Sequence, residues 1–213
     1  SEVAALDAIT HAFPSDIPPP SLQAMKKIPP RSILPRPGLD PLFGFTLDGR
    51  GFAMGPDTPR PWTHVLANRQ GHGVLIGNDG AQFSFSGNAQ QNGLTPFTLD
   101  TVPAQSCAQA VYVTDLETGA LVAPGLTPLR QSAAQEVRFE PGQAVLASAG
   151  ADLALCMTVA VLPDEPVEVR VLRVENRSAH PRKLRLTAFA HLSLAELPQD
   201  SHGQIRTHFD PEL

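Results

Sequence analysis

Apolar and polar residues alternate along much of the chain from residue 42 onward. The alternation is clearest in the segments 153–161, 167–174 and 184–194, which are separated by polar turn clusters. Successive side chains of a β-strand point to opposite faces, so a period of two predicts strands with one buried face. No long helical segment lies between them, which argues against strand–helix–strand units. The pattern predicts an all-β fold, a large antiparallel β-sandwich.

Short polar segments that contain glycine divide the expected strands. Asp48-Gly49 separates two apolar runs, and the same arrangement recurs at 78–80 and 117–119. Glycine, and to a lesser degree Asn and Asp, accepts the positive φ of the tight turns that join antiparallel strands. All three positions are therefore predicted to be β-hairpin turns.

The second half of the chain also suggests which side chains face the core. The alternation in 167–174 predicts that Glu168 and Arg170 lie in solvent as a charged surface without function, while the valines between them face inward. Those valines are Val167, Val169 and Val171. The segments 167–174 and 184–194 are expected to pair antiparallel across the turn at 176–182, which would bring Glu168 opposite a basic neighbour.

The N-terminal part has a different character. Residues 1–13 place apolar side chains at helical spacing, and residues 14–41 contain nine prolines around a short helical turn at 22–28. Proline fixes φ and lacks a backbone donor, so this stretch cannot be a central strand. We expect residues 1–38 to be a Pro-rich, partly helical arm or linker, and residues 39–213 to be the β-sandwich domain.

Composition narrows the function classes. The chain of 213 residues is 42% apolar but only 6% aromatic, so most of its core must come from Ala, Val and Leu. With 21 acidic and 16 basic residues its formal charge is -5, which argues against nucleic-acid and anionic-membrane partners. Neither a long apolar span nor a signal-peptide pattern occurs in the sequence, which predicts a cytoplasmic location.

Metal and disulfide chemistry find little support. Cys107 and Cys156 match no short metal spacing, and we interpret both as buried thiols, with a disulfide between them as the alternative. The seven histidines show no local metal-binding spacing. Two pairs of carboxylates lie in turns, Asp115 with Glu117 and Asp164 with Glu165, without an apolar pocket that could tune an acid catalyst. No cofactor and no metal are predicted.

Five segments occur in the same order as in the N-terminal β-sandwich of glycosyltransferase family 36, which the chain resembles from about residue 39 to 213. They are 61–68 (PWTHVLAN), 78–80 (NDG), 92–97 (NGLTPF), 111–119 (VYVTDLETG) and the pair 173–178 and 181–184 (RVENRS, PRKL). That family comprises inverting phosphorylases of cellobiose, chitobiose and related glycans, and the phosphorylase-like portion of bacterial cyclic β-1,2-glucan synthases. The Pro-rich approach and the glycine-rich stretch 43–54 resemble the synthase type most.

The resemblance implies a super-sandwich, with a galactose-mutarotase-like fold, that precedes an (α/α)6 catalytic barrel. In the family the general acid is an aspartate of that barrel, and inorganic phosphate attacks the anomeric carbon. None of the barrel lies in these residues, so we expect a fragment of a longer polypeptide that catalyses nothing alone. Its expected partners are the barrel of the parent chain and β-linked glucan, and the parent protein is compatible with association with the inner membrane.

The loop 87–97 is the candidate for glycan contact. Relatives read like ENSRENRLTPW there, and the loop can reach the active site, in some members across a dimer. This chain keeps the Asn, Leu, Thr and Pro of the pattern. The charged residues and the tryptophan of the pattern are replaced by other residues in this chain. The substituted positions are Gly87, Gln90, Gln91, Gly93 and Phe97. Because charged hydrogen bonds are about twice as strong as neutral ones, a site here would be weaker than in the relatives.

Two interpretations of this loop remain. In the first, amides bind sugar hydroxyls and aromatic rings supply an apolar face for a pyranose. The candidate carbohydrate-binding residues are Trp62, Phe85, Asn88, Gln90, Gln91, Asn92, Thr95 and Phe97. In the second, Asn92-Gly93 makes a turn, the amides satisfy loop backbone, and Trp62 fills the core. The loss of charged groups favours the second interpretation. A freestanding lectin-like domain and a dimerisation module, whose Pro-rich arm wraps a neighbour, are the alternative functions.

Overall fold

A computed structural model of the chain describes residues 43–46, 49–58, 62–89, 92–97, 108–130 and 134–193. All of them belong to one compact unit, Ile33–Leu213. The regular elements of the described residues are strands, in agreement with the predicted all-β class. The expected arm at 1–38, including the helix at 1–13, lies outside the described residues, as do Gln90, Gln91 and Cys107.

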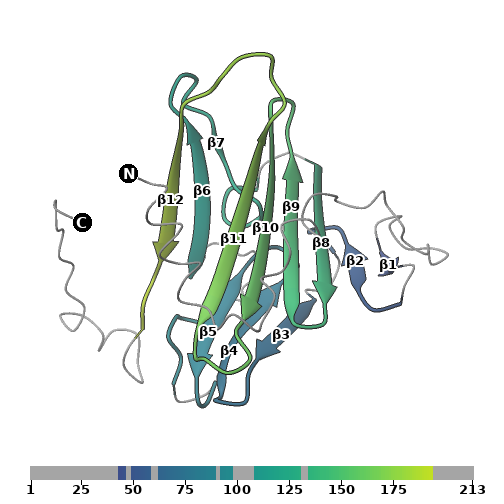
Figure 1. The fold of residues 1–213 in the computed structure, drawn as a ribbon, viewed down its shortest axis with the longest axis vertical. Helices are drawn as coiled ribbons and strands as arrows, with labels where there is room; N and C mark the ends of the chain where they lie inside the picture. The colour runs from purple at the N-terminus through teal and green to yellow at the C-terminus, as the bar shows by residue number, and fades with distance from the viewer. Residues whose placement is uncertain are drawn as a thin grey trace. The chain divides into compact units, whose positions relative to one another are not determined.

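The strands form three antiparallel sheets (Figure 1). The largest has the order β1-β2-β8-β9-β10-β11, and the two smaller ones have the orders β12-β6-β7 and β3-β4-β5. The bounds are β1 (Gly44–Phe45), β2 (Phe52–Met54), β3 (Thr63–Ala67), β4 (His72–Gly77), β5 (Gln82–Ser86), β6 (Gln109–Asp115), β7 (Leu121–Val122), β8 (Ala134–Glu140), β9 (Gln143–Ala149), β10 (Leu153–Val161), β11 (Glu168–Asn176) and β12 (Leu184–Ala190).

The predicted hairpin turns are confirmed. β1 pairs with β2, β4 with β5, and β6 with β7, each across one of the three glycine-containing segments. Gly80 has a φ of +93°, which residues with a Cβ rarely adopt, and its amide donates to the carbonyl of Gly77 at 3.0 Å. A Cβ at Gly80 would also lie 3.0 Å from the Cα of Gly125, so the close backbone approach disfavours larger residues there.

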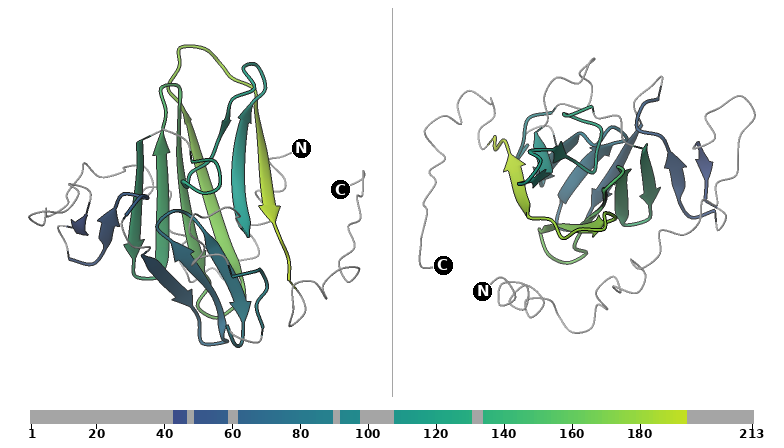
Figure 2. Two further views of the ribbon diagram at one scale, coloured as in Figure 1. Left: turned by 180° about the vertical axis from the view of Figure 1, so that it is seen from behind. Right: turned by 90° about the horizontal axis from the view of Figure 1, so that it is seen from above.

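One apolar core joins the large sheet to the smaller ones, which are seen facing it in Figure 2. Side chains from β2, β3, β4, β8, β9 and β10, together with Phe43 just before β1, form its buried centre, and Val111 of β6 packs against it. The buried members are Phe43, Met54, Leu66, Val74, Ile76, Val137, Phe139, Ala144, Leu146, Met157 and Val159. Facing sheets that share a core confirm the β-sandwich.

The expected pairing of 167–174 with 184–194 is wrong. β11 pairs only with β10 among the described strands, and β12 pairs with β6 in a different sheet. The connection between β11 and β12 crosses from one sheet to the other, and the amide of Arg177 anchors it by donating to the carbonyl of Asp152 at 2.7 Å. Consecutive strands of a sandwich commonly change sheet in this way, which local alternation does not reveal.

The predicted facing of β11 is also wrong. Arg170 lies opposite Val159 and Leu172 opposite Met157, and those two β10 side chains belong to the core. The even-numbered positions of β11 therefore face inward, and only 9% of the Glu168 side chain is exposed. Val167 instead is exposed, and Val169 and Val171 are only partly buried. The prediction failed because it assigned the polar set to solvent, whereas these polar groups are paired inside the protein.

Candidate functional site

The loop that follows β5 turns back along that strand. The amide of Ser86 donates to the carbonyl of Asn92 at 3.0 Å, and the amide of Asn92 donates to the carbonyl of Asn88 at 2.8 Å. Phe85 forms an isolated bridge with Gly93. Asn88 and Asn92 are both exposed at the start and end of this turn. The backbone thus brings two of the candidate amides to one surface beside β5.

Three phenylalanines surround the same stretch. The ring of Phe97 contacts the buried Phe83 edge to face, with centroids 5.2 Å apart, and the Phe85 ring stacks on Phe83 at 6.1 Å. Phe85 also covers Gly73, where a Cβ would lie 2.4 Å from its ring. Phe97 remains 51% exposed. This set, Phe83, Phe85 and Phe97, is called the β5 aromatic group below, and Phe97 gives it an accessible apolar ring.

Thr95 holds the loop in place. It is buried, and its hydroxyl accepts a hydrogen bond from the amide of Ser84 at 3.0 Å. The neighbouring Leu94 amide donates to the Ser84 carbonyl at 2.8 Å, and the Leu94 carbonyl accepts from the amide of Ser193 at 2.8 Å. Of the candidate residues, Thr95 therefore fixes the loop backbone, whereas Asn88, Asn92 and Phe97 are presented to solvent.

Trp62 lies apart from these residues. It precedes β3, which β4 separates from β5, and its ring stacks on Phe52 at 5.6 Å and meets Phe43 edge to face at 5.3 Å. Its backbone amide donates to the Asn78 side chain at 2.9 Å. Trp62 is 44% exposed, so it packs at the margin of the core and does not fill it as the second interpretation of the sequence expected.

A buried polar network, which the sequence analysis missed, joins all three sheets. Arg170 of β11 donates to the side-chain oxygen of Gln82 at 2.9 Å, contacts that of Gln109, and pairs with Glu168. Ser84 donates to Glu168 at 2.6 Å and accepts from Gln109 at 2.5 Å. Buried charges persist where they are paired and hydrogen-bonded. The signal available in the sequence was a Glu-x-Arg pair inside an otherwise apolar strand.

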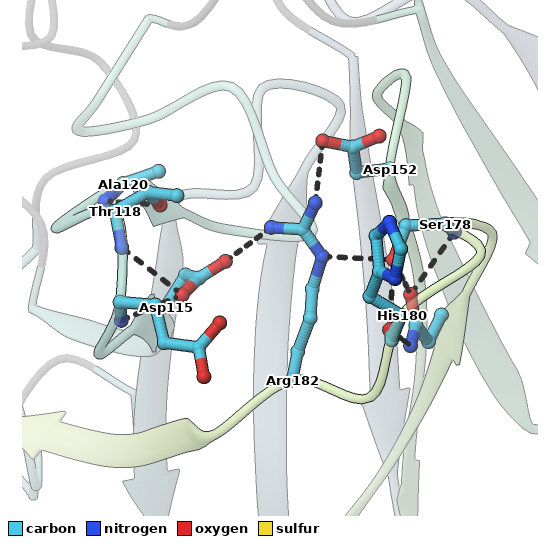
Figure 3. A network of polar contacts seen from close by, with 9 residues as sticks. Asp115, Thr118, Ala120, Asp152, Ser178, His180 and Arg182 are labelled. Carbon is cyan, nitrogen blue, oxygen red and sulfur yellow. Dashed lines mark hydrogen bonds and ion pairs between the residues drawn. The ribbon is translucent and has the colours of Figure 1, made fainter.

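A second network surrounds Arg182 (Figure 3). Arg182 pairs with Asp115 at the end of β6 and with Asp152 in the β9–β10 turn, where the nitrogen and oxygen are 2.7 Å apart. Its Nε donates to the Ser178 hydroxyl at 3.0 Å. The Glu117 amide, which donates to Asp115 at 2.9 Å, and the Arg182 guanidinium together lower the pKa of Asp115. Arg182 thereby links the sheet of β12 to the six-stranded sheet.

Comparison with known proteins places this arrangement in a family. The family model for the supersandwich domain of glycosyl hydrolase 94 matches residues 52–213. The chain belongs to this family. Cyclic beta-(1,2)-glucan synthase NdvB of Rhizobium meliloti (strain 1021) is 34% identical over 152 residues, which make up 69% of this chain and 5% of that relative. The match confirms the resemblance that the ordered sequence segments indicated. The chain spans about a twentieth of the length of this curated relative.

The residues 52–213 that the family model matches contain the loop, the β5 aromatic group, Trp62 and the residues of both polar networks. The acid pairs lie at or beside turns: Asp115 is the last residue of β6 and Glu117 lies in the turn that follows it, while Asp164 and Glu165 lie in the β10–β11 connection. Asp115 accepts from the amides of its own turn, and the backbone carbonyls of Asp164 and Glu165 accept hydrogen bonds from side chains of the β3–β4 turn. Within the described residues no group of three or more His, Cys, Asp and Glu could hold a metal ion.

Two further features of the domain bear on the sequence predictions. Cys156 is a free, half-buried thiol, and burial raises its pKa. Across the described part of the chain, the structure contains no helix with the length and apolarity to cross a bilayer.

Proposed function

We propose that this supersandwich domain is a non-catalytic module of a cyclic β-glucan synthase-like or glycoside phosphorylase-like protein. It packs on the helical catalytic barrel of the parent polypeptide and contacts β-linked glucan. The family match over residues 52–213 is the observation that supports the module. The charged groups of the described interior also support a structural role. Glu168 forms an ion pair with Arg170, and Asp115 is held by an ion pair and by a backbone amide.

The glucan contact is proposed for the surface formed by Asn88, Asn92 and Phe97. An exposed ring offers a flat apolar face to a pyranose, and side-chain amides supply both donors and acceptors to hydroxyls. The buried Phe83 and Thr95 hold the ring and the loop in position. Gln90 and Gln91 continue the same turn in the sequence and stay candidates for this contact.

Packing on other parts of the parent polypeptide is proposed for the region around β12. Leu186 of β12 lies opposite Val113 of β6 on the same face of the sheet. Val113 is fully buried, whereas Leu186 is 60% exposed. Among the described strands β12 is the edge of this sheet, so the apolar layer ends there, and large exposed apolar side chains at an edge are typical of a contact surface.

The module hypothesis predicts that the purified chain has no phosphorylase activity. Incubation with β-linked glucose oligomers and inorganic phosphate should consume no phosphate and release no sugar phosphate, because the family's general acid belongs to the barrel. The parent protein, assayed in parallel, is the positive control. Turnover by the purified chain at a rate comparable with the parent protein would contradict the hypothesis.

The glucan contact predicts a measurable effect of Phe97→Ala. Removing the exposed ring should weaken binding of a β-(1,2)-glucan oligomer by about five-fold or more, as expected when an aromatic anchor is truncated. Titration calorimetry on the wild type and the variant gives the two dissociation constants.

Phe189→Ala is the matched control, because Phe189 of β12 is similarly exposed at 45% but belongs to another sheet. The control should bind like the wild type. Equal affinity of all three proteins, or absence of binding by the wild type, would exclude this surface as a glucan site while leaving the module assignment intact.

A further inference from the structure

The sheet β3-β4-β5 has a second apolar side, which points away from the shared core. Val74 and Ile76 of β4 belong to that core, so the alternate positions of the strand point outward. The outward side chains form a separate apolar cluster in which Phe83 is buried and Leu75 and Phe85 are partly buried. We call Val65, Leu75, Phe83 and Phe85 the outer face of this sheet.

The outer face leads to the exposed ring of Phe97. Val65 lies opposite Leu75 and Leu75 opposite Phe83, so these three side chains form one row across the sheet. The ring of Phe97 adjoins the end of this row, with its centroid 5.2 Å from that of Phe83. Two strand spacings of about 4.8 Å and this ring distance give a path of roughly 15 Å, the length of about three linked pyranose rings. Val65 is 56% and Phe97 51% exposed, so both ends of the path are accessible.

Two glycines keep the middle strand of this side low. The outward positions of β4 are Gly73, Leu75 and Gly77, and among them only Leu75 carries a side chain. A Cβ at Gly73 would lie 2.4 Å from the ring of Phe85, so this ring reaches across the place where a side chain would stand. Glycine inside a strand often marks a position where a ligand approaches the backbone. The outer face therefore combines aromatic rings with a low middle strand between its two accessible ends.

The chemistry of this side favours a neutral partner. None of the residues of β3, β4 and β5 is Lys, Arg, Asp or Glu, although these types make up 17% of the chain. The solvent side of an antiparallel sheet usually carries polar residues. A glycan needs no charged partner, because the apolar face of a pyranose packs on rings and its hydroxyls bind to amides. The exposed Asn92, in the loop that precedes Phe97, supplies such an amide.

We propose that the outer face extends the glucan contact at Phe97 into a binding surface for a chain of about three sugar residues. Phe85 is the second ring of this surface, and Val65 lies at its far end. The inference rests on the proposed glucan contact and adds to it a direction, from Phe97 across β5 and β4 to β3, and a preference for longer oligomers. A single exposed ring holds one pyranose, whereas the row holds several.

Two β-(1,2)-linked glucose oligomers, a disaccharide and a hexasaccharide, test the extension by titration calorimetry on the full chain. The disaccharide can occupy the Phe97 contact alone, whereas the hexasaccharide can also cover Phe85 and Val65. The wild type should bind the hexasaccharide about three-fold or more tightly, since one further aromatic contact corresponds to roughly two- to ten-fold in affinity. A hexasaccharide also offers several equivalent registers to a single ring, so variants must identify the surface that is responsible.

Phe85→Leu keeps an apolar side chain over Gly73 but removes the ring, and it should lower the ratio of the two affinities by about three-fold. Val65→Tyr adds a ring at the exposed far end and should strengthen hexasaccharide binding by a similar factor. A gain of affinity cannot result from unfolding, and circular dichroism melts establish that each variant is folded. The matched control is Val167→Tyr, because Val167 is similarly exposed at 44% but lies beside β11 in another sheet, and it should bind both oligomers like the wild type.

Three outcomes would overturn the extension. The first is equal hexasaccharide binding by Val65→Tyr and Val167→Tyr together with an unchanged affinity ratio in Phe85→Leu, in which case a loss of affinity in Phe97→Ala would still support the original contact. The second is self-association of the wild type that Val65→Tyr alters while sugar binding stays the same, which would assign the outer face to a second copy of the chain. The third is absence of binding of either oligomer by the wild type, which would remove the glucan contact itself.

Discussion

Replacing Arg170 with methionine is expected to lower the free energy of unfolding by about 3 kcal/mol, because it leaves the Glu168 carboxylate buried without its cation. For a domain of this size that corresponds to a fall in Tm of roughly 6–12 °C. Arg170 also donates to the side-chain oxygens of Gln82 and Gln109, and these hydrogen bonds would be lost as well. These side chains come from three sheets, so the loss would weaken the assembly of the sandwich. Thermal and urea unfolding measure the effect.

The matched control is Arg177→Met. Arg177 pairs with Glu175 at 3.5 Å, at the same two-residue spacing as Arg170 and Glu168, but the two side chains are 41% and 49% exposed. Exposed ion pairs contribute about 0–1 kcal/mol, so this variant should unfold near the wild-type temperature. The combination Glu168→Gln with Arg170→Met should recover part of the lost stability, since it removes the uncompensated charge. Equal destabilisation by Arg170→Met and Arg177→Met would show that burial of the pair has no influence.

Much of the fold follows from local sequence. The segment 153–161 is β10 without a shift of either boundary, because a nine-residue apolar run between turn clusters has few other solutions in an all-β chain. The glycine-containing turns were equally predictable, since a positive φ at Gly80 or Gly119 is a local requirement. The strand segments and hairpins could therefore be predicted from short windows.

The arrangement of strands among sheets could not. Whether β12 pairs with β11 or with β6 depends on contacts such as that between Asp115 and Arg182, which lie 67 residues apart. The inward face of β11 was misjudged for the same reason: a polar side chain is stable inside only if partners from other strands satisfy it. Gln82, Ser84 and Gln109 are those partners, and nothing near Glu168 in the sequence indicates them.

The candidate site was predictable in part. Asn88, Asn92 and Phe97 were grouped because they are neighbours in one loop; the backbone joins Asn92 to Asn88, and all three residues are exposed. Thr95 belongs to the same loop but faces inward to Ser84, which depends on where β5 lies. Trp62 was added because of its chemistry alone, and β4 separates it from the others. Proximity in sequence therefore indicated which candidate residues lie in one loop, whereas residue type alone did not.

Arg182→Met is the second replacement with a large expected effect. Asp115 is 1% exposed, and Arg182 is its cationic partner in the described structure as well as the link to Asp152 and Ser178. Its removal leaves a buried carboxylate supported only by the amides of its turn and frees the connection between β11 and β12. We expect Tm at neutral pH to fall by roughly 5 °C or more. Arg185→Met, on the exposed surface of β12, is the matched control and should change Tm little.

The difference between the wild type and Arg182→Met should also depend on pH with a defined sign. Hydrogen bonds from the turn amides and from Arg182 hold the pKa of Asp115 below its ordinary value of 3.8, so the unfolded chain takes up this proton first as the pH falls. The stability that Asp115 contributes is therefore complete above about pH 5, where the carboxylate is ionised in both states. It is lost as the pH falls below that range and through the folded pKa of Asp115, because the protonated carboxyl of the wild type no longer forms the ion pair with Arg182 that the variant lacks at every pH. Melting curves across this range should thus show the two proteins converging in Tm as the solution becomes more acidic, and a Tm difference that stays constant or widens would exclude the Asp115 carboxylate as its source.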